Sequence, residues 1–170
     1  REDQRLARYV HLGTGNYNER SARLYTDFGL LTSAEDFGSD ASAFFNTITG
    51  YSEPPPFNRL VMAPMGMRDK ILLLIQREAD WARNGHSAEI LLKMNSLVDP
   101  KIIQELYAAG KAGVRIQMNV RGICCLRPGL VGVSENITVR SVVDRFLEHS
   151  RIFYFENACQ PEVFVGSADW

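Results

Sequence analysis

The chain has 170 residues, of which 45% are hydrophobic and 23% are charged, and its formal net charge is −1. These values are ordinary for a globular protein, and the near-zero charge excludes broad electrostatic binding of nucleic acid. The three cysteines, two of them adjacent, form neither a disulfide framework nor a metal-ligand pattern, so reduced thiols and a cytoplasmic location are expected. No apolar run approaches the ~18 residues of a membrane span, and the start lacks signal-peptide form.

The first fifty residues predict a strand pair and one helix. Residues 5–12 read as a strand that leads into Gly13-Thr14-Gly15-Asn16, a turn whose amides could face an anion. Residues 26–32 are also strand-like, and the apolar spacing of residues 41–48 predicts a helix. Three consecutive prolines at 54–56 then indicate a domain boundary, with one unit over residues 1–52 and a second over residues 53–170.

The second unit alternates strands with helices. A short buried strand is expected at 60–64, followed by a helix at 68–84, a strand at 88–95, a helix at 99–109 and a strand at 114–121. Further strands are expected at 137–143, 152–156 and 162–165. This order predicts an α/β fold with a mixed sheet flanked by helices. Ligands of such sheets bind at the carboxyl ends of strands, so Asn95 and Arg121 are expected to converge near His149.

The run His149-Ser150-Arg151 carries the clearest chemical indication. In a strand, the side chains of His149 and Arg151 would share one face because the side-chain period is two. A histidine beside a fixed cation suits an anionic electrophile, above all a phosphoryl group. The alternative is a histidine that merely ends a strand.

Three further side chains are candidates with structural alternatives. Arg121 is a natural partner for phosphate oxygens, or else a surface arginine at a strand end. Tyr25 could stack on a purine ring, or pack at the rim of the core. Lys93 could line a pocket, or lie on the wet face of a half-buried strand. His11 is interpreted as a half-buried strand histidine, and the chain has no P-loop motif.

The C-terminal motifs resemble those of the phospholipase D superfamily. His149-x-Arg151-x4-Glu156 and Gly166-Ser167-x-Asp169 are similar to its His-x-Lys-x4-Asp and Gly-Ser-x-Asn, with three substitutions. Enzymes of that superfamily carry the motif twice, and Gly13-Thr14-Gly15-Asn16 is similar to part of the other copy. The missing His-x-Lys of that copy is expected before residue 1, so the chain is expected to be a piece of a longer enzyme.

Five motifs in order are similar to those of bacterial polyphosphate kinase of the first type. They begin at His11, Ala22, Val120, Asp144 and Gly166. The resemblance implies the end of one phospholipase-D-like catalytic domain followed by most of a second. It also implies reversible transfer of the terminal phosphate of ATP to polyphosphate through a phosphohistidine.

Carried over by motif, Tyr25, Arg121 and His149 would contact ATP, and His149 would be the second catalytic histidine, a general acid and base. Arg151 would add positive charge for the phosphate.

The same resemblance implies magnesium, whose ligands, like the phosphorylated histidine, are expected upstream. The chain alone is therefore expected to be inactive and to hold no metal. ATP, ADP and polyphosphate are the expected partners, in a homo-oligomer that is cytoplasmic or peripheral to the membrane and does not bind nucleic acid. Two alternatives remain: a phospholipase-D-type phosphodiesterase or phosphatidyltransferase, and a non-catalytic module that binds phosphate or nucleotide.

Overall fold

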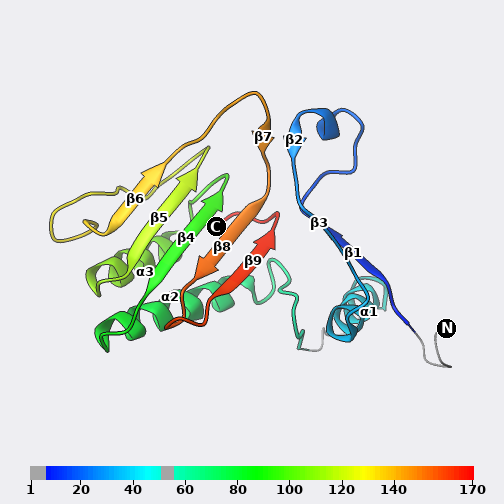
Figure 1. Ribbon diagram of the computed structural model, residues 1–170, viewed down its shortest axis with the longest axis horizontal. Helices are drawn as coiled ribbons and strands as arrows, with labels where there is room; N and C mark the ends of the chain where they lie inside the picture. The colour runs from blue at the N-terminus through cyan, green and yellow to red at the C-terminus, as the bar shows by residue number, and fades with distance from the viewer. Residues whose placement is uncertain (1–6, 51–55) are drawn as a thin grey trace.

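The computed structural model describes residues 7–50, here called the first region, and residues 56–170, the second region (Figure 1). The first region lies beside the free edge of the main sheet of the second region. The predicted boundary at residues 52 and 53 lies outside the described residues. Among these residues, no helix combines the length and the apolar character that crossing a membrane requires.

A five-stranded sheet forms the body of the second region. Its strands are β4 (Glu89–Met94), β5 (Arg115–Val120), β6 (Ile137–Arg140), β8 (Arg151–Phe155) and β9 (Glu162–Gly166), in the order β6-β5-β4-β8-β9. The strands β4, β5 and β6 are parallel, whereas β8 runs antiparallel to both β4 and β9. The mixed α/β sheet expected from the sequence is confirmed.

Two helices cover one face of this sheet, α2 (Met67–Arg83) and α3 (Pro100–Lys111) (Figure 1). The α3 helix is capped by Asp99, whose side chain accepts from the backbone N–H of Lys101 at 2.9 Å and of Ile102 at 3.1 Å. Buried residues alternate with half-buried or exposed ones along β4, β5 and β8, so one face of each strand packs under the helices. The buried apolar core lies entirely within residues 71–170.

The first region is a thin ribbon with one helix. Antiparallel pairing joins β1 (Val10–Gly13) to β3 (Gly29–Thr32), and α1 (Glu35–Gly50) follows. A short 3-10 helix, η1 (Ser21–Arg23), leads into β2 (Tyr25–Thr26). The single strand predicted at 26–32 is therefore two strands. The break falls where the backbone N–H of Phe28 donates to the hydroxyl of Thr14, at 2.9 Å.

The strand predicted at 60–64 is wrong, because the chain forms coil and turn there. The carboxylate of Asp40 on α1 accepts from the backbone N–H groups of Asn58, Arg59 and Leu60 at 2.6–2.9 Å. These N–H groups donate to a buried carboxylate in the first region, so they are not available for the backbone hydrogen bonds of a strand. Asp40 therefore fastens residues 58–60, here called the linker, to α1.

A two-residue strand that the sequence did not predict joins the two regions. This strand, β7 (Leu147–Glu148), pairs in parallel with β2, placing Tyr25 opposite Leu147 and Thr26 opposite Glu148. The strand predicted at 137–143 correspondingly ends at Arg140, and the chain leaves the sheet to reach β2. Figure 1 shows β7 and β2 side by side above the edge of the sheet.

Candidate active site

His149 lies where β7 ends and β8 has not begun, outside any strand. The prediction that it shares a strand with Arg151 is therefore wrong, because pairing of β7 with β2 draws residues 147–149 toward the first region. The backbone N–H of His149 donates to the carbonyl of Thr26 at 3.2 Å. Its ring Nδ1 lies 2.9 Å from Oδ1 of Asp27. The imidazole is thus held by the first region through both backbone and side chain.

Asp27 is the acid of this pair, and it follows β2 directly. Its side chain is 23% exposed and that of His149 is 13% exposed, so water screens their contact only in part. The hydroxyl of Thr14 donates to the same Oδ1 at 3.1 Å. Oδ1 of Asp27 therefore accepts from the Thr14 hydroxyl and also from Nδ1–H of His149. This arrangement leaves Nε2 of His149 available for other contacts.

Tyr25 stacks on the ring of His149, with ring centroids 5.0 Å apart and planes inclined by 23°. The predicted purine-stacking role stays a prediction, and one face of the phenol ring already packs against the imidazole. Tyr25 and Asp27 therefore fix the plane and the rotation of the histidine ring from two sides.

Arg151 points to the helix-covered face of the sheet and is 7% exposed. Its Nε and Nη2 donate to the two carboxylate oxygens of Asp169 at 3.0 and 2.9 Å. Its Nη1 donates to the carbonyl of His149 at 2.5 Å. Asp169 also accepts from the backbone N–H of Asn95 at 2.9 Å. The guanidinium thus links the Gly166–Asp169 turn to the backbone of the histidine.

The carboxyl of Asp169 responds to these neighbours. Burial alone would raise its pKa, but the bonds from Arg151 and from the N–H groups of Asn95 and Ser96 outweigh burial. The pKa of Asp169 is therefore held below 3.8, and the pair with Arg151 is charged at neutral pH.

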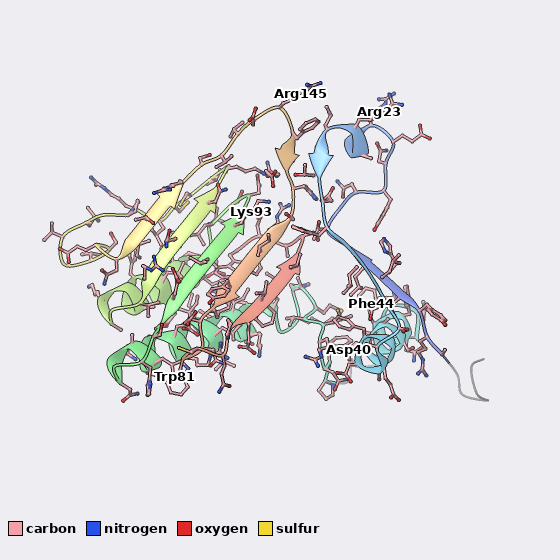
Figure 2. The ribbon with its side chains drawn as sticks, viewed as in Figure 1. Arg23, Asp40, Phe44, Trp81, Lys93 and Arg145 are labelled. Carbon is pink, nitrogen blue, oxygen red and sulfur yellow. The ribbon has the colours of Figure 1, made fainter. Side chains whose placement is uncertain are left out.

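Lys93 lies on the opposite, open face of the sheet, near the end of β4 (Figure 2). Its ammonium donates to Oε2 of Glu148 at 2.7 Å and to the hydroxyl of Ser150 at 2.9 Å. Bonds from Lys93 and then from Thr26 lower the pKa of Glu148. Lys93 therefore holds both sequence neighbours of His149.

Arg121 follows the carboxyl end of β5, and the next residue, Gly122, donates its N–H to the carbonyl of Asn95 at 2.8 Å. The backbone N–H of Asn95 in turn donates to Asp169. Its buried Nε has no hydrogen-bond partner among residues 7–50 and 56–170. A buried guanidinium donor without a partner is costly.

The carboxylates of the site do not fit a magnesium ion. Asp27 serves His149 and Thr14, Asp169 serves Arg151, and Glu148 serves Lys93. In the part of the chain that the structure describes, no three His, Cys, Asp or Glu side chains gather as a metal site. A carboxylate already paired with a cation is a poor ligand for a second one.

The structure therefore brings Tyr25 and His149 together and adds three residues that sequence reasoning missed: Asp27, Thr14 and Glu148. The period of two could have found Asp27, because Tyr25 and Asp27 fall on the same side of an extended segment. The geometry offers a histidine able to exchange a proton at Nε2 and an arginine able to receive an anion.

Two family models match the chain: "Polyphosphate kinase C-terminal domain 1" over residues 1–54 and "Polyphosphate kinase C-terminal domain 2" over residues 60–170. A polyphosphate kinase of Synechocystis is 55% identical over 97% of the chain, and one of Rhodopirellula baltica is 56% identical over 100%. The chain spans only 23% and 20% of these two relatives. The crystal structure of polyphosphate kinase from Porphyromonas gingivalis matches with a TM-score of 0.89 at 44% identity, covering 96% of this chain and 27% of that one.

Proposed function

Because the chain belongs to the polyphosphate kinase family, we propose that it supplies part of the active site of an enzyme that transfers the terminal phosphate of ATP to polyphosphate, reversibly and through a phosphohistidine. The observation that carries this proposal is the Asp27–His149 pair, assembled from the two regions at 2.9 Å. The chain spans about a quarter of its relatives, so the activity belongs to the longer parent protein.

His149 acts in this proposal as the general acid and base. Asp27 accepts from Nδ1–H and so directs Nε2 toward the substrate. With both nitrogens protonated, the ring is a cation that can donate its Nε2 proton to the departing phosphate oxygen. In the reverse reaction, neutral Nε2 takes that proton back.

Arg121 provides charge for the phosphate in this proposal. Phosphoryl transfer needs positive charge around the equatorial oxygens and little covalent chemistry from the protein. The position of Arg121 directly after the carboxyl end of β5 supports this role, because a guanidinium there can donate to phosphate oxygens.

Arg151 contributes differently. Three of its nitrogens already donate to Asp169 and to the backbone of His149. We propose that Arg151 stabilises the backbone that carries His149 and adds to the positive potential around a bound phosphate. Tyr25 would hold the imidazole plane and offer its other face to the adenine ring.

The remaining parts of the proposal rest on the family. The phosphorylated histidine and the magnesium ligands would belong to the parent protein outside this chain, so the chain alone would not turn over ATP. ATP, ADP and polyphosphate are the proposed substrates. Assembly as a homo-oligomer, a cytoplasmic location and contact with a membrane stay predictions.

Titrating ATP into the parent protein by calorimetry tests the nucleotide role. Arg121→Ala should weaken binding by about 10- to 100-fold, the worth of one or two charge-assisted hydrogen bonds. Arg115→Ala is the matched control, because Arg115 begins the same strand, is 67% exposed and pairs with Glu89. Equal affinity of the Arg121→Ala protein and the wild type would contradict the role of Arg121.

The same parent protein distinguishes the reaction classes. Incubation with ATP should yield polyphosphate, and a phosphodiester model substrate should remain intact. Diester cleavage without nucleotide turnover would instead indicate a phospholipase-D-type hydrolase. Binding of ATP without either reaction would indicate a non-catalytic module.

A further inference from the structure

We propose that the Gly13-Thr14-Gly15 turn is a cradle for the carboxylate of Asp27, and that Thr14 is a positioning residue for His149. This inference deepens the proposed function, on which its kinetic part rests. It also revises the sequence-based expectation that the turn's amides could face an anion, because the structure shows a carboxylate of the chain itself against this turn.

Thr14 makes its contacts to the segment that carries the acid. It is 5% exposed, and its hydroxyl accepts from the backbone N–H of Phe28 at 2.9 Å. Having used its oxygen as an acceptor there, the hydroxyl donates its proton to Oδ1 of Asp27 at 3.1 Å. The backbone N–H of Thr14 donates to the carbonyl of Phe28 at 3.0 Å. One residue thus fixes both the backbone beside Asp27 and the carboxylate.

Gly15 provides the space that the carboxylate occupies. A Cβ at this position would lie 2.7 Å from Oδ2 and 2.9 Å from Cγ of Asp27. Both distances are shorter than non-bonded carbon contacts allow, so a side chain at residue 15 would displace the acid. The turn therefore matches Asp27 in shape as well as in hydrogen bonding.

The cradle reaches His149 through a single oxygen. Oδ1 of Asp27 accepts from the Thr14 hydroxyl and lies 2.9 Å from Nδ1 of His149. The other charged groups beside the histidine are paired among themselves, Lys93 with Glu148 and Arg151 with Asp169. Among the described residues, Asp27 is thus the carboxylate that orients the imidazole, and Thr14 orients Asp27.

A double-mutant cycle in the parent protein tests this chain of contacts. The variants are Thr14→Val, which keeps the branched shape and removes the hydroxyl, Asp27→Ala, which removes the carboxylate, and the pair together. Thr14→Ser keeps the hydroxyl and is the matched control. If Thr14 acts through Asp27, removing its hydroxyl matters only while the acid is present.

The activity-independent measurement is the rate at which diethyl pyrocarbonate modifies His149. Trypsin releases this residue in the peptide 146–151, and His86, the reference, in the peptide 84–93. Thr14→Val should speed labelling of His149 at least threefold relative to His86, because the ring is released from its 13% exposed position. Thr14→Ser should match the wild type, and Thr14→Val should add nothing to Asp27→Ala.

Turnover supplies the second measurement. Thr14→Val should lower kcat for polyphosphate synthesis about tenfold, part of the 10²- to 10⁴-fold that a general acid and base contributes. The KM for ATP should stay within twofold, because the change leaves Arg121 untouched. A merely structural role for Thr14 would reduce the amount of active enzyme and persist in the Asp27→Ala background.

The two measurements separate the two proposals. A wild-type parent that makes no polyphosphate would overturn the proposed function, while the labelling cycle would still decide the cradle. Unchanged labelling in Thr14→Val would overturn the cradle, as would equal effects in the presence and absence of the Asp27 carboxylate. Should Thr14→Val fail to fold, Gly15→Ala replaces it with the same expected rise in labelling, and no rise would overturn the cradle.

Discussion

The two regions of this molecule are stabilised in different ways. The second region buries a continuous apolar core between its sheet and two helices. In the first region, the buried residues of the described stretch are Thr14, Gly38 and Asp40, and none of them is apolar. Asp40, Asp27 and the β2–β7 pair fasten this region to the second one. Apolar packing therefore stabilises the second region, and directional polar contacts hold the first region and the candidate site at the edge of its sheet.

Removing core volume from the second region should have the largest effect on stability. Phe155 is fully buried, so Phe155→Ala should lower the free energy of unfolding by about 3–5 kcal/mol. Phe45→Ala in the first region removes the same group from a side chain that is 59% exposed, and should cost less than about 0.5 kcal/mol. Urea unfolding followed by far-ultraviolet circular dichroism measures both, and equal losses would contradict the contrast between the regions.

Breaking the Asp40 anchor should loosen the first region without unfolding the second. Asp40→Ala removes the buried acceptor of the N–H groups of Asn58, Arg59 and Leu60, at a cost of about 1–3 kcal/mol. Hydrogen exchange at Arg59 and Leu60 should accelerate while the strands of the sheet stay protected. The matched control is Asp36→Ala, which removes only an exposed ion pair with Arg59. Unchanged exchange would mean that another contact holds the linker.

Acid should weaken the anchors before the core. Burial raises the pKa of Asp40, but three backbone N–H donors outweigh it and hold the pKa below 3.8. A carboxyl whose folded-state pKa is lowered stabilises the fold above its unfolded value, and this contribution is lost as the pH falls through the lower, folded value. Exchange at Leu60 should therefore rise below about pH 4, and Asp40→Asn should flatten that dependence. A wild type with the same flat profile would contradict this assignment.

Glu78 in the second region should show the opposite and smallest dependence. Burial raises its pKa above 4.5, despite bonds from the backbone of Asn157 and from Arg77. The stability it contributes is present below its unfolded pKa and is lost as the pH rises through the raised, folded value. Glu78→Gln should therefore gain stability relative to the wild type as the pH rises above 4.5. A parallel pair of stability curves would contradict this sign.

Much of the second region could be predicted, because its signals are local. The period of two in β4 and β5 and the Asp99-Pro100 start of α3 are read directly from neighbouring residues. Each wrong strand prediction concerns a segment whose backbone forms hydrogen bonds with a residue far away in the sequence. The carboxylate of Asp40 accepts from the backbone of residues 58–60, which prevents the predicted strand. Pairing of β7 with β2 places His149 outside β8. Sequence spacing within one segment contains no information about such partners.

The residues of the candidate site also divide into those that the sequence predicts and those that only the fold shows. His149 and Arg121 follow from motifs, and Tyr25 follows from the family resemblance. The partners of these residues lie 122 positions away for His149 and 18 positions away for Arg151. The period of two places Asp27 on the side of Tyr25, but only the fold shows that Thr14 contacts the Asp27 carboxylate and that this carboxylate contacts His149.

The turnover of parent enzyme carrying His149→Asn is the most direct test of the catalytic pair. We expect kcat for polyphosphate synthesis to fall by at least about 100-fold, the loss of a general acid and base. His86→Asn, at a histidine that packs on Trp81 away from the site, should leave kcat unchanged. A His149→Asn enzyme whose kcat stays within threefold of the wild type would contradict the account.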